Sequence, residues 1–173
     1  MNKCSWCALS AEERKWMLMQ TTSWSVYMAD EQDYIGRCIL VLNRHCGCLS
    51  ELTDKEWMEL KHLIDSLEQC FKSVLGAELC NWSCLLNSFY KSPVLSPHLH
   101  LHVRPRYKEP VSLNRIQYVD EEFGHHYSLK KESKLGEKEF KEIFDMLKSG
   151  LIKINRNLTE SEENEYYTAP HVC

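Results

Sequence analysis

The feature that most constrains the fold is a run of alternating residues at His98–Val103, with the sequence HLHLHV. Alternation with a period of two is typical of a β-strand that buries one face, because successive side chains point to opposite sides of a sheet. The aliphatic residues are therefore predicted to enter a core. The three imidazoles, which titrate near neutral pH, are predicted to lie side by side on the other face, about 6.5–7 Å apart along the strand.

Three interpretations of this strand follow from the residues alone. A half-exposed strand without a function is disfavoured, because histidine is a poor choice for an ordinary solvated strand face. His-x-His on a strand can instead hold zinc or iron. In the third interpretation the middle imidazole, His100, is a nucleophile that its neighbours position. The last two stay open at this point.

Length, charge and cysteine content narrow the class of protein. The 173 residues suit one domain, long enough to bury a substantial core. A formal net charge of −4 argues against binding to nucleic-acid polymers or anionic membranes. We expect no membrane span and no signal peptide, because the chain lacks an apolar run of the required length. Nine cysteines without a secretory signal indicate reduced thiols plus a metal pair, and so a cytoplasmic protein.

Periodicity and capping residues predict an antiparallel α+β domain. Ser10, with Glu13 three residues later, indicates a short helix over 10–20. The clearest helix begins at Thr53 and ends near Gly76, and its apolar stripe is expected to enter the core: Trp57, Leu60, Ile64, Leu67, Phe71 and Val74. Apolar runs predict three more strands: 24–28, 38–42 and 79–86. The segment 111–127 is expected to be irregular, and a last amphipathic helix is expected over 137–151.

The alternating run followed by Arg104-Pro105-Arg106 resembles the signature of the histidine-triad (HIT) nucleotide hydrolases and transferases. Residues 36–45 resemble the family's strand and following loop, and the segment CSWC at 4–7 is similar to the N-terminal Cys-x-x-Cys of its zinc-carrying members. The resemblance implies a HIT-like antiparallel sheet with a long helix packed on it over residues 1–107. A C-terminal helical extension is then expected over 108–155 and a flexible polar tail over 156–173.

The same resemblance implies one structural zinc ion and no organic cofactor. Its ligands would be four residues: Cys4, Cys7, His45 and His98. A two-residue gap lets both thiolates reach one ion, which would tie the N-terminus to two strand ends. Such a closed site leaves no position for an activated water. Cys46 and Cys48 form a rival pair, ranked lower because a one-residue gap is less usual for a single zinc ion.

By resemblance, His100 attacks the α-phosphorus of a nucleotide and forms a nucleotidyl-histidine that water then hydrolyses. His102 donates a hydrogen bond to a phosphate oxygen. Asn87, which precedes the triad strand, is placed where the family carries an amide near the phosphate. An alternative interpretation of Asn87 is a turn residue that ends a strand.

Substrate-binding residues are also expected. Asp30 is the candidate acceptor for a ribose hydroxyl. Arg104 shares the face of the histidines by parity and would bind phosphate bidentately, although a solvated arginine at a strand end fits the sequence equally well. His125 and His126 are expected to be surface or packing residues of the extension, with a role in the pocket as the alternative.

Two positions depart from the family pattern. Arg37 stands where the family commonly has a fourth histidine, and a permanent cation there cannot relay protons but can hold an anionic phosphate. Val94 stands where a glutamine is often found. Ser92 or Ser96 is the candidate replacement for that lost function.

The expected function is hydrolysis of a nucleotide phosphoanhydride or phosphoramidate, with a dinucleoside polyphosphate among the candidate substrates. One alternative is a catalytically weak nucleotide-binding or scaffold protein of the same family. Another is a metal-dependent hydrolase that uses all three histidines as ligands. The resemblance further implies a homodimer, to which the helix over 53–75 would contribute.

Overall fold

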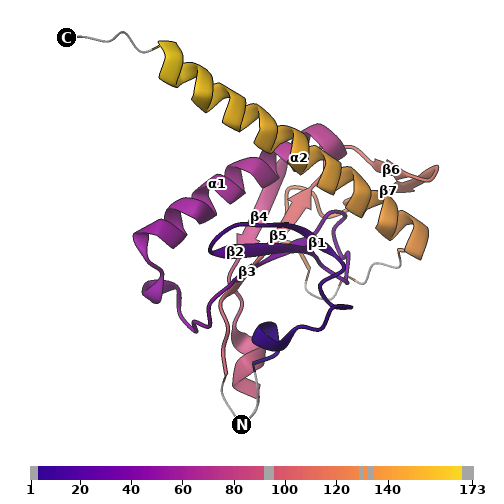
Figure 1. Ribbon diagram of the computed structural model, residues 1–173. Helices are drawn as coiled ribbons and strands as arrows, with labels where there is room; N and C mark the ends of the chain where they lie inside the picture. The colour runs from indigo at the N-terminus through magenta and orange to yellow at the C-terminus, as the bar shows by residue number, and fades with distance from the viewer. Residues whose placement is uncertain (1–3, 92–95, 129–130, 132–134, 169–173) are drawn as a thin grey trace.

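The computed structural model describes residues 4–91, 96–128, 131 and 135–168, with side chains as far as residue 156. Its main element is a five-stranded antiparallel sheet in the order β1-β2-β3-β5-β4, and two helices pack beside it (Figure 1). The sheet strands are β1 (Met17–Gln20), β2 (Trp24–Met28), β3 (Cys38–Leu42), β4 (Leu79–Ser83) and β5 (His100–Arg106). The chain is therefore α+β, as the sequence predicted.

The triad strand β5 lies inside the sheet, between β3 and β4. His100 pairs with Val41, and His102 pairs with Ile39 on one side and Ser83 on the other. Leu101 and Val103 are buried in the core cluster, so the aliphatic and imidazole side chains take opposite faces. The alternation of faces is confirmed, but β5 is not buried on one face alone, because His100 and Arg104 on the histidine face are buried as well.

The helix α1 (Asp54–Cys70) begins as predicted, with a capping box between Thr53 and Glu56, and a π-helical turn, η3 (Phe71–Leu75), continues it. Gly76 ends it with φ 76°, a left-handed conformation that favours glycine. Leu60, Leu67 and Phe71 of the predicted stripe are buried, together with Leu63 and Cys70. Trp57 is wrongly placed in that stripe, because 46% of its surface is exposed.

The predicted helix over 10–20 is wrong. Ser10 and Glu13 do exchange the capping contacts, with the Ser10 amide donating to the Glu13 carboxylate at 2.7 Å and the Glu13 amide donating to Ser10 Oγ at 3.3 Å. These contacts close a turn only, and residues 17–20 form the edge strand β1 on β2. Pairing with β2 therefore overrides the local helix signal.

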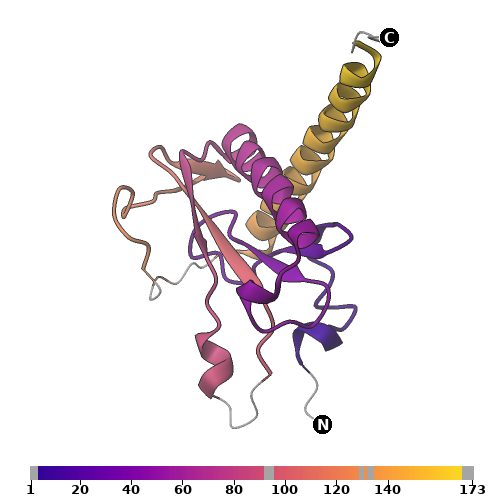
Figure 2. The same ribbon diagram turned by 90° about the vertical axis from the view of Figure 1, so that its left-hand side faces the viewer.

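The C-terminal extension holds more regular structure than the sequence indicates. The expected irregular segment contains a hairpin of β6 (Val111–Leu113) and β7 (Ile116–Tyr118). The helix α2 (Glu137–Thr168) extends beyond residue 151, through much of the segment predicted to be a flexible tail, and its far half projects from the domain (Figures 1 and 2). Within the described residues, neither helix combines the length and apolarity that a membrane crossing requires. The division of the chain at residues 107 and 155 stays a prediction.

Two short turns flank the start of β5, at the end of the sheet opposite α2's projecting half (Figure 2). The turn η1 (Trp6–Ala8) follows Cys4, and the turn η4 (Asn87–Lys91) follows β4. The Trp6 and Phe89 rings lie with their centroids 5.7 and 5.8 Å from that of His100. The fold thus encloses the middle imidazole between two aromatic side chains.

Candidate functional site

Four side chains of the predicted zinc set come together where the N-terminal segment meets β5. The ligand atoms of Cys4, Cys7, His45 and His98 all lie within 4.8 Å of one another. Sγ of Cys4 and of Cys7 lie 3.3 and 3.4 Å from Nδ1 of His98, and Sγ of Cys7 lies 3.5 Å from Nδ1 of His45. Tetrahedral zinc with its usual bond lengths sets sulfur and nitrogen ligands about 3.5 Å apart.

The second nitrogen of His98 explains why its Nδ1 faces the thiols. Nε2 of His98 donates to the carbonyl oxygen of Leu42 at 2.7 Å, which leaves Nδ1 as the lone-pair atom. A ligand histidine held through its other nitrogen is typical of zinc sites. The four donor atoms, and the hydrogen bond that orients His98, therefore fit a structural zinc ion. Cys46 and Cys48 are absent from this cluster of described residues.

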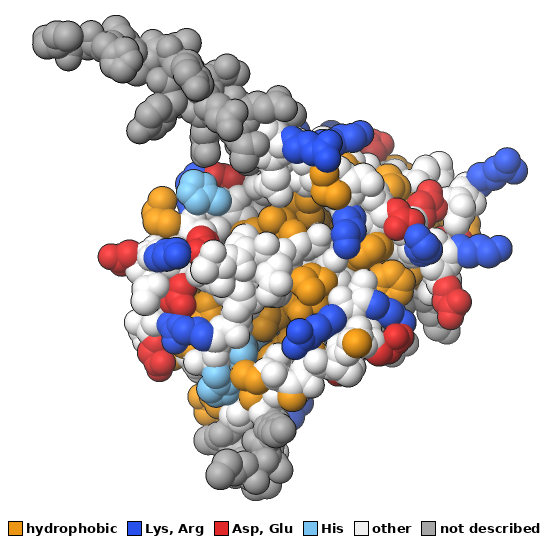
Figure 3. Space-filling view, viewed as in Figure 1, with side chains coloured by type: hydrophobic (Ala, Val, Ile, Leu, Met, Phe, Trp, Pro, Cys, Tyr) orange, Lys and Arg blue, Asp and Glu red, His pale blue; other side chains and the backbone are white. Residues whose placement is uncertain are grey.

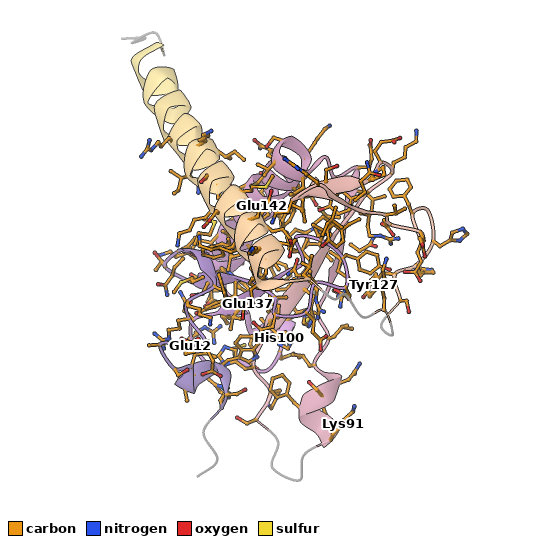
Figure 4. The ribbon with its side chains drawn as sticks, turned by 90° about the vertical axis from the view of Figure 1, so that its right-hand side faces the viewer. Glu12, Lys91, His100, Tyr127, Glu137 and Glu142 are labelled. Carbon is orange, nitrogen blue, oxygen red and sulfur yellow. The ribbon has the colours of Figure 1, made fainter. Side chains whose placement is uncertain are left out.

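The nucleophile candidate His100 is oriented by the backbone of the same strand. Its Nδ1 donates to the carbonyl oxygen of His98 at 2.9 Å, so the neutral ring has its lone pair on Nε2. Burial lowers the pKa of His100, and only 5% of the residue is exposed. In Figure 4 it lies between the segment that carries Glu12 and the one that carries Tyr127. The ring is thus held neutral and in one tautomer.

His102 lies next to His100, with ring centroids 4.9 Å apart in an edge-to-face arrangement. Nη2 of Arg37 donates to Nδ1 of His102 at 3.4 Å. Burial, His100 and the cations Arg37 and Arg104 lower the pKa of His102 to about 3. His102 is therefore a neutral imidazole near physiological pH.

A carboxylate that was not predicted from the sequence, Asp33, connects Arg37 and Arg104. Asp33 accepts from Nη1 of Arg37 at 3.1 Å and from Nε of Arg104 at 2.8 Å. The Arg104 guanidinium also stacks on the Tyr127 ring, 4.6 Å from its centroid. Arg104 is thus a buried member of an ion triad, and the interpretation as a solvated strand end is wrong. Asp33 gave no signal in the sequence because no motif surrounds it.

Arg106 joins the C-terminal extension to the sheet. All its donor groups are used: they reach Asp120, Asn81 and the carbonyl oxygens of Glu122 and His125, at 2.6 to 3.1 Å. Its guanidinium also stacks on the Tyr34 ring. This places residues 120–127 over the end of the histidine face. His125 and His126 themselves are exposed and line a separate hollow beside Trp82.

The candidate ribose acceptor Asp30 lies directly after β2. It lines a hollow of about 430 Å³ together with Trp6, Tyr27 and Ile39. Because Trp6 also packs against His100, this hollow adjoins the histidine face. The aromatic side chains here were not predicted, although Trp6 stands between the two cysteines whose positions were.

The remaining predicted site residues are Asn87, Ser92, Val94 and Ser96, which precede the triad strand. Asn87 is exposed and begins the turn η4, whose Phe89 contacts His100. Ser96 is half-buried, two residues before His98. Ser92 and Val94 lie outside the described residues. The roles of Asn87 and Ser96 stay predictions.

Neither a family model nor a curated protein matches this sequence. Solved structures do match in fold. A hypothetical histidine triad nucleotide-binding protein from Sulfolobus tokodaii strain 7 matches with a TM-score of 0.61 at 14% identity, covering 88% of this chain and 95% of its own. A zinc-bound histidine triad family protein from Mycobacterium smegmatis matches with a TM-score of 0.61 at 14% identity, covering 89% of this chain and 96% of its own.

A uridylyltransferase structure is also similar in part. It matches with a TM-score of 0.59 at 19% identity over 82% of this chain, but over only 43% of its own length. The likeness to the two smaller proteins, by contrast, extends over nearly their whole length. The same architecture therefore serves both as a small protein and as part of a larger one.

Proposed function

Because this chain has the fold of the histidine-triad proteins, as its sequence predicted, we propose that it binds a nucleotide and hydrolyses a phosphoanhydride or phosphoramidate bond at His100. The observation that carries the proposal is the hydrogen bond from Nδ1 of His100 to the carbonyl oxygen of His98. It leaves the Nε2 lone pair available for attack on phosphorus without prior deprotonation.

In the proposed mechanism, Nε2 of His100 forms a bond to the α-phosphorus while the bond to the leaving group breaks and its electron pair departs with that group. Water then attacks the nucleotidyl-histidine, the N–P bond breaks, and the electron pair returns to Nε2. The extra proton of the attacking water passes to the solvent. His102 stabilises the charge that develops on a non-bridging oxygen through its N–H.

The hollow beside His100 is the proposed nucleoside subsite. Asp30 accepts from the ribose hydroxyls, and the Trp6 and Tyr27 rings, with centroids 6.4 Å apart, provide apolar surface for the base. Basic and acidic side chains are interspersed among the described residues of the face drawn in Figure 3, in keeping with a small-molecule substrate rather than a nucleic-acid polymer.

In this proposal the zinc ion has a structural role, not a catalytic one. When bound, the ion supplies a link between the N-terminal segment and β5. The alternative, a catalytic ion held by all three histidines, is disfavoured by their orientation. Nδ1 of His98 faces the cysteines, whereas Nδ1 of His100 and of His102 are occupied by a carbonyl oxygen and a guanidinium.

The test is to detect the covalent intermediate. Brief incubation with a panel of nucleotides, an alkaline quench that preserves the N–P bond, and peptide mass spectrometry should find a nucleotidyl adduct on His100. The adduct should be lost in His100→Ala and kept in His62→Ala, which changes an exposed histidine of α1. Binding without adduct or turnover would instead favour the weak nucleotide-binding protein.

A further inference from the structure

Arg37 occupies a position from which it dictates the hydrogen placement on His102. Its Nη2 lies 3.4 Å from Nδ1 of His102, within hydrogen-bond geometry. A guanidinium has five donors and no acceptor, and it stays charged at any pH a protein tolerates. Nδ1 of His102 must therefore be the accepting lone pair. A neutral His102 then carries its hydrogen on Nε2.

The side chain of Arg37 is itself fixed by a buried carboxylate. Asp33, which is 6% exposed, accepts from Arg37 with one oxygen and from Arg104 with the other, at 3.1 and 2.8 Å. Charge-assisted hydrogen bonds of this kind hold their partners in one geometry. The nitrogen that donates to Asp33, Nη1, also reaches the carbonyl oxygen of Glu31 at 3.5 Å. The guanidinium is therefore held between a fixed anchor and His102.

The surroundings of His102 also oppose its protonation. The charged or titratable groups that lower its pKa are His100 on the same strand and the cations Arg37 and Arg104. From β4 the paired residue is Ser83, which carries no charge, and from β3 it is Ile39. No described group of opposite charge bonds to the ring. Over the range from pH 5 to 9 His102 is a hydrogen-bond donor rather than an acid.

We propose that Arg37 is a positioning residue that locks His102 as a neutral Nε2–H donor, and that the protein consequently acts on substrates whose leaving group departs as an unprotonated phosphate anion. This inference rests on the function proposed above and narrows its substrate class to nucleoside and dinucleoside polyphosphates.

The restriction follows from the balance of protons in the first step. When the bond from the α-phosphorus to a bridging oxygen breaks, the electron pair leaves on a phosphate oxygen that is stable as an anion, so no proton is needed. An amine leaving group has to gain a proton as its P–N bond breaks. A neutral imidazole whose Nδ1 is occupied by a guanidinium can neither supply that proton nor relay one from elsewhere.

The proposed effect of Arg37 on the tautomer of His102, called the lock below, is tested by nitrogen-15 NMR of the histidine rings between pH 5 and 9. The sample is the zinc-loaded, full-length protein, and the His102 signal is assigned by comparison with the spectrum of His102→Gln. We expect hydrogen on Nε2, none on Nδ1, and no titration. Arg37→Met should give mixed tautomers or restore titration. Arg37→Lys should keep the wild-type tautomer, because an ammonium group also only donates. Arg115→Met, which removes an exposed arginine in the β6–β7 hairpin, is the matched control.

A wild-type spectrum with hydrogen on Nδ1, or with an imidazolium that titrates near neutral pH, would overturn the lock. So would a His102 signal that is the same in Arg37→Met as in the wild type, while the zinc content and melting temperature of both are equal. These readouts need no turnover, so they stand apart from the fate of the proposed function.

The substrate class is tested by comparing kcat/KM for a dinucleoside tetraphosphate with that for an adenosine phosphoramidate. The wild type should prefer the polyphosphate on the order of 100-fold, the low end of what general acid catalysis contributes to the other substrate. Arg37→His, which replaces the guanidinium by a proton-exchanging ring, should reduce that preference. Equal rates on the two compounds would overturn the restriction. If neither compound is hydrolysed and no adduct forms on His100, the proposed function is refuted. The NMR result alone then shows whether Arg37 sets the tautomer of His102.

Discussion

At the scale of single residues, the strand alternation predicts which side chains share a face of β5. It does not predict the side chains from other elements that bond to them. The pattern HLHLHV was sufficient to place His100 and His102 on one face, because the period of a strand is fixed. Asp33 lies far in sequence from Arg104, and only the paired strands bring their side chains together. A contact of this kind leaves no local signature, so the sequence predicted an arginine on the face without its anion.

Glu56 is a residue whose contribution to stability depends on pH. Its carboxylate accepts from Nε and Nη2 of Arg44, at 2.6 and 2.9 Å, and from the Thr53 amide. The Arg44 guanidinium, followed by the Thr53 groups, lowers the pKa of Glu56 from its ordinary 4.5 to about 2. Because the pKa is lowered on folding, the stabilisation is fully present above about pH 4.5 and is lost as the pH falls through about 2.

We therefore expect Glu56→Gln to lower the free energy of unfolding by about 1–2 kcal/mol at pH 7, a range typical of a lost helix cap. The difference from the wild type should shrink as the pH falls from 5 towards 2, which urea unfolding at several pH values would measure. Glu78→Gln, which alters an exposed glutamate, should show no such trend. A deficit that stays constant down to pH 2 would contradict the assignment.

At the scale of elements, the strands and the capped helix were predictable, because each carries its own period and end signals. The N-terminal segment was not, since Ser10 and Glu13 form the same contacts in a turn as they would at the start of a helix. What holds this segment is the cluster of Cys4 and Cys7 with two histidines from distant elements. The four side chains of this cluster were predicted to meet from a family resemblance, and no periodicity would have paired them.

The zinc cluster predicts different outcomes for two cysteines that are both exposed. Cys7→Ser should lower the zinc content from about one ion per chain and lower the melting temperature, because it removes one of four ligands. Cys48→Ser should retain the ion. Elemental analysis of the purified proteins measures both. Zinc loss in the Cys48 variant alone would instead favour the rival pair Cys46 and Cys48.

At the scale of the whole molecule, the connection between the domain and its extension depends on Arg106. From the sequence, Arg106 was only the end of a motif, whereas in the structure it donates to Asp120 and to the carbonyl oxygens of Glu122 and His125. The extent of α2 was equally unpredicted, because polar residues beyond 151 indicate exposure and not the end of a helix. The polar composition of this segment predicts that its side chains are exposed to solvent, but it does not predict whether the backbone is helical.

The expected homodimer stays a prediction, and α1 offers a place to test it. Trp57 and Met58 are 46% and 55% exposed there, an arrangement that favours burial against a second apolar surface. Light scattering after gel filtration should give twice the chain mass for the wild type, and Trp57→Glu should shift it towards the monomer. Lys61→Glu, which changes an exposed charge of the same helix, is the control. A monomeric wild type at micromolar concentration would contradict this expectation.

Trp6 stands between two thiols that face the same histidines, and its ring rests against His100. The ring that contacts His100 and the two thiols of the predicted metal site consequently belong to one short segment, residues 4–7. Chelation or oxidation at those sulfur atoms is therefore expected to change how the Trp6 ring packs against His100.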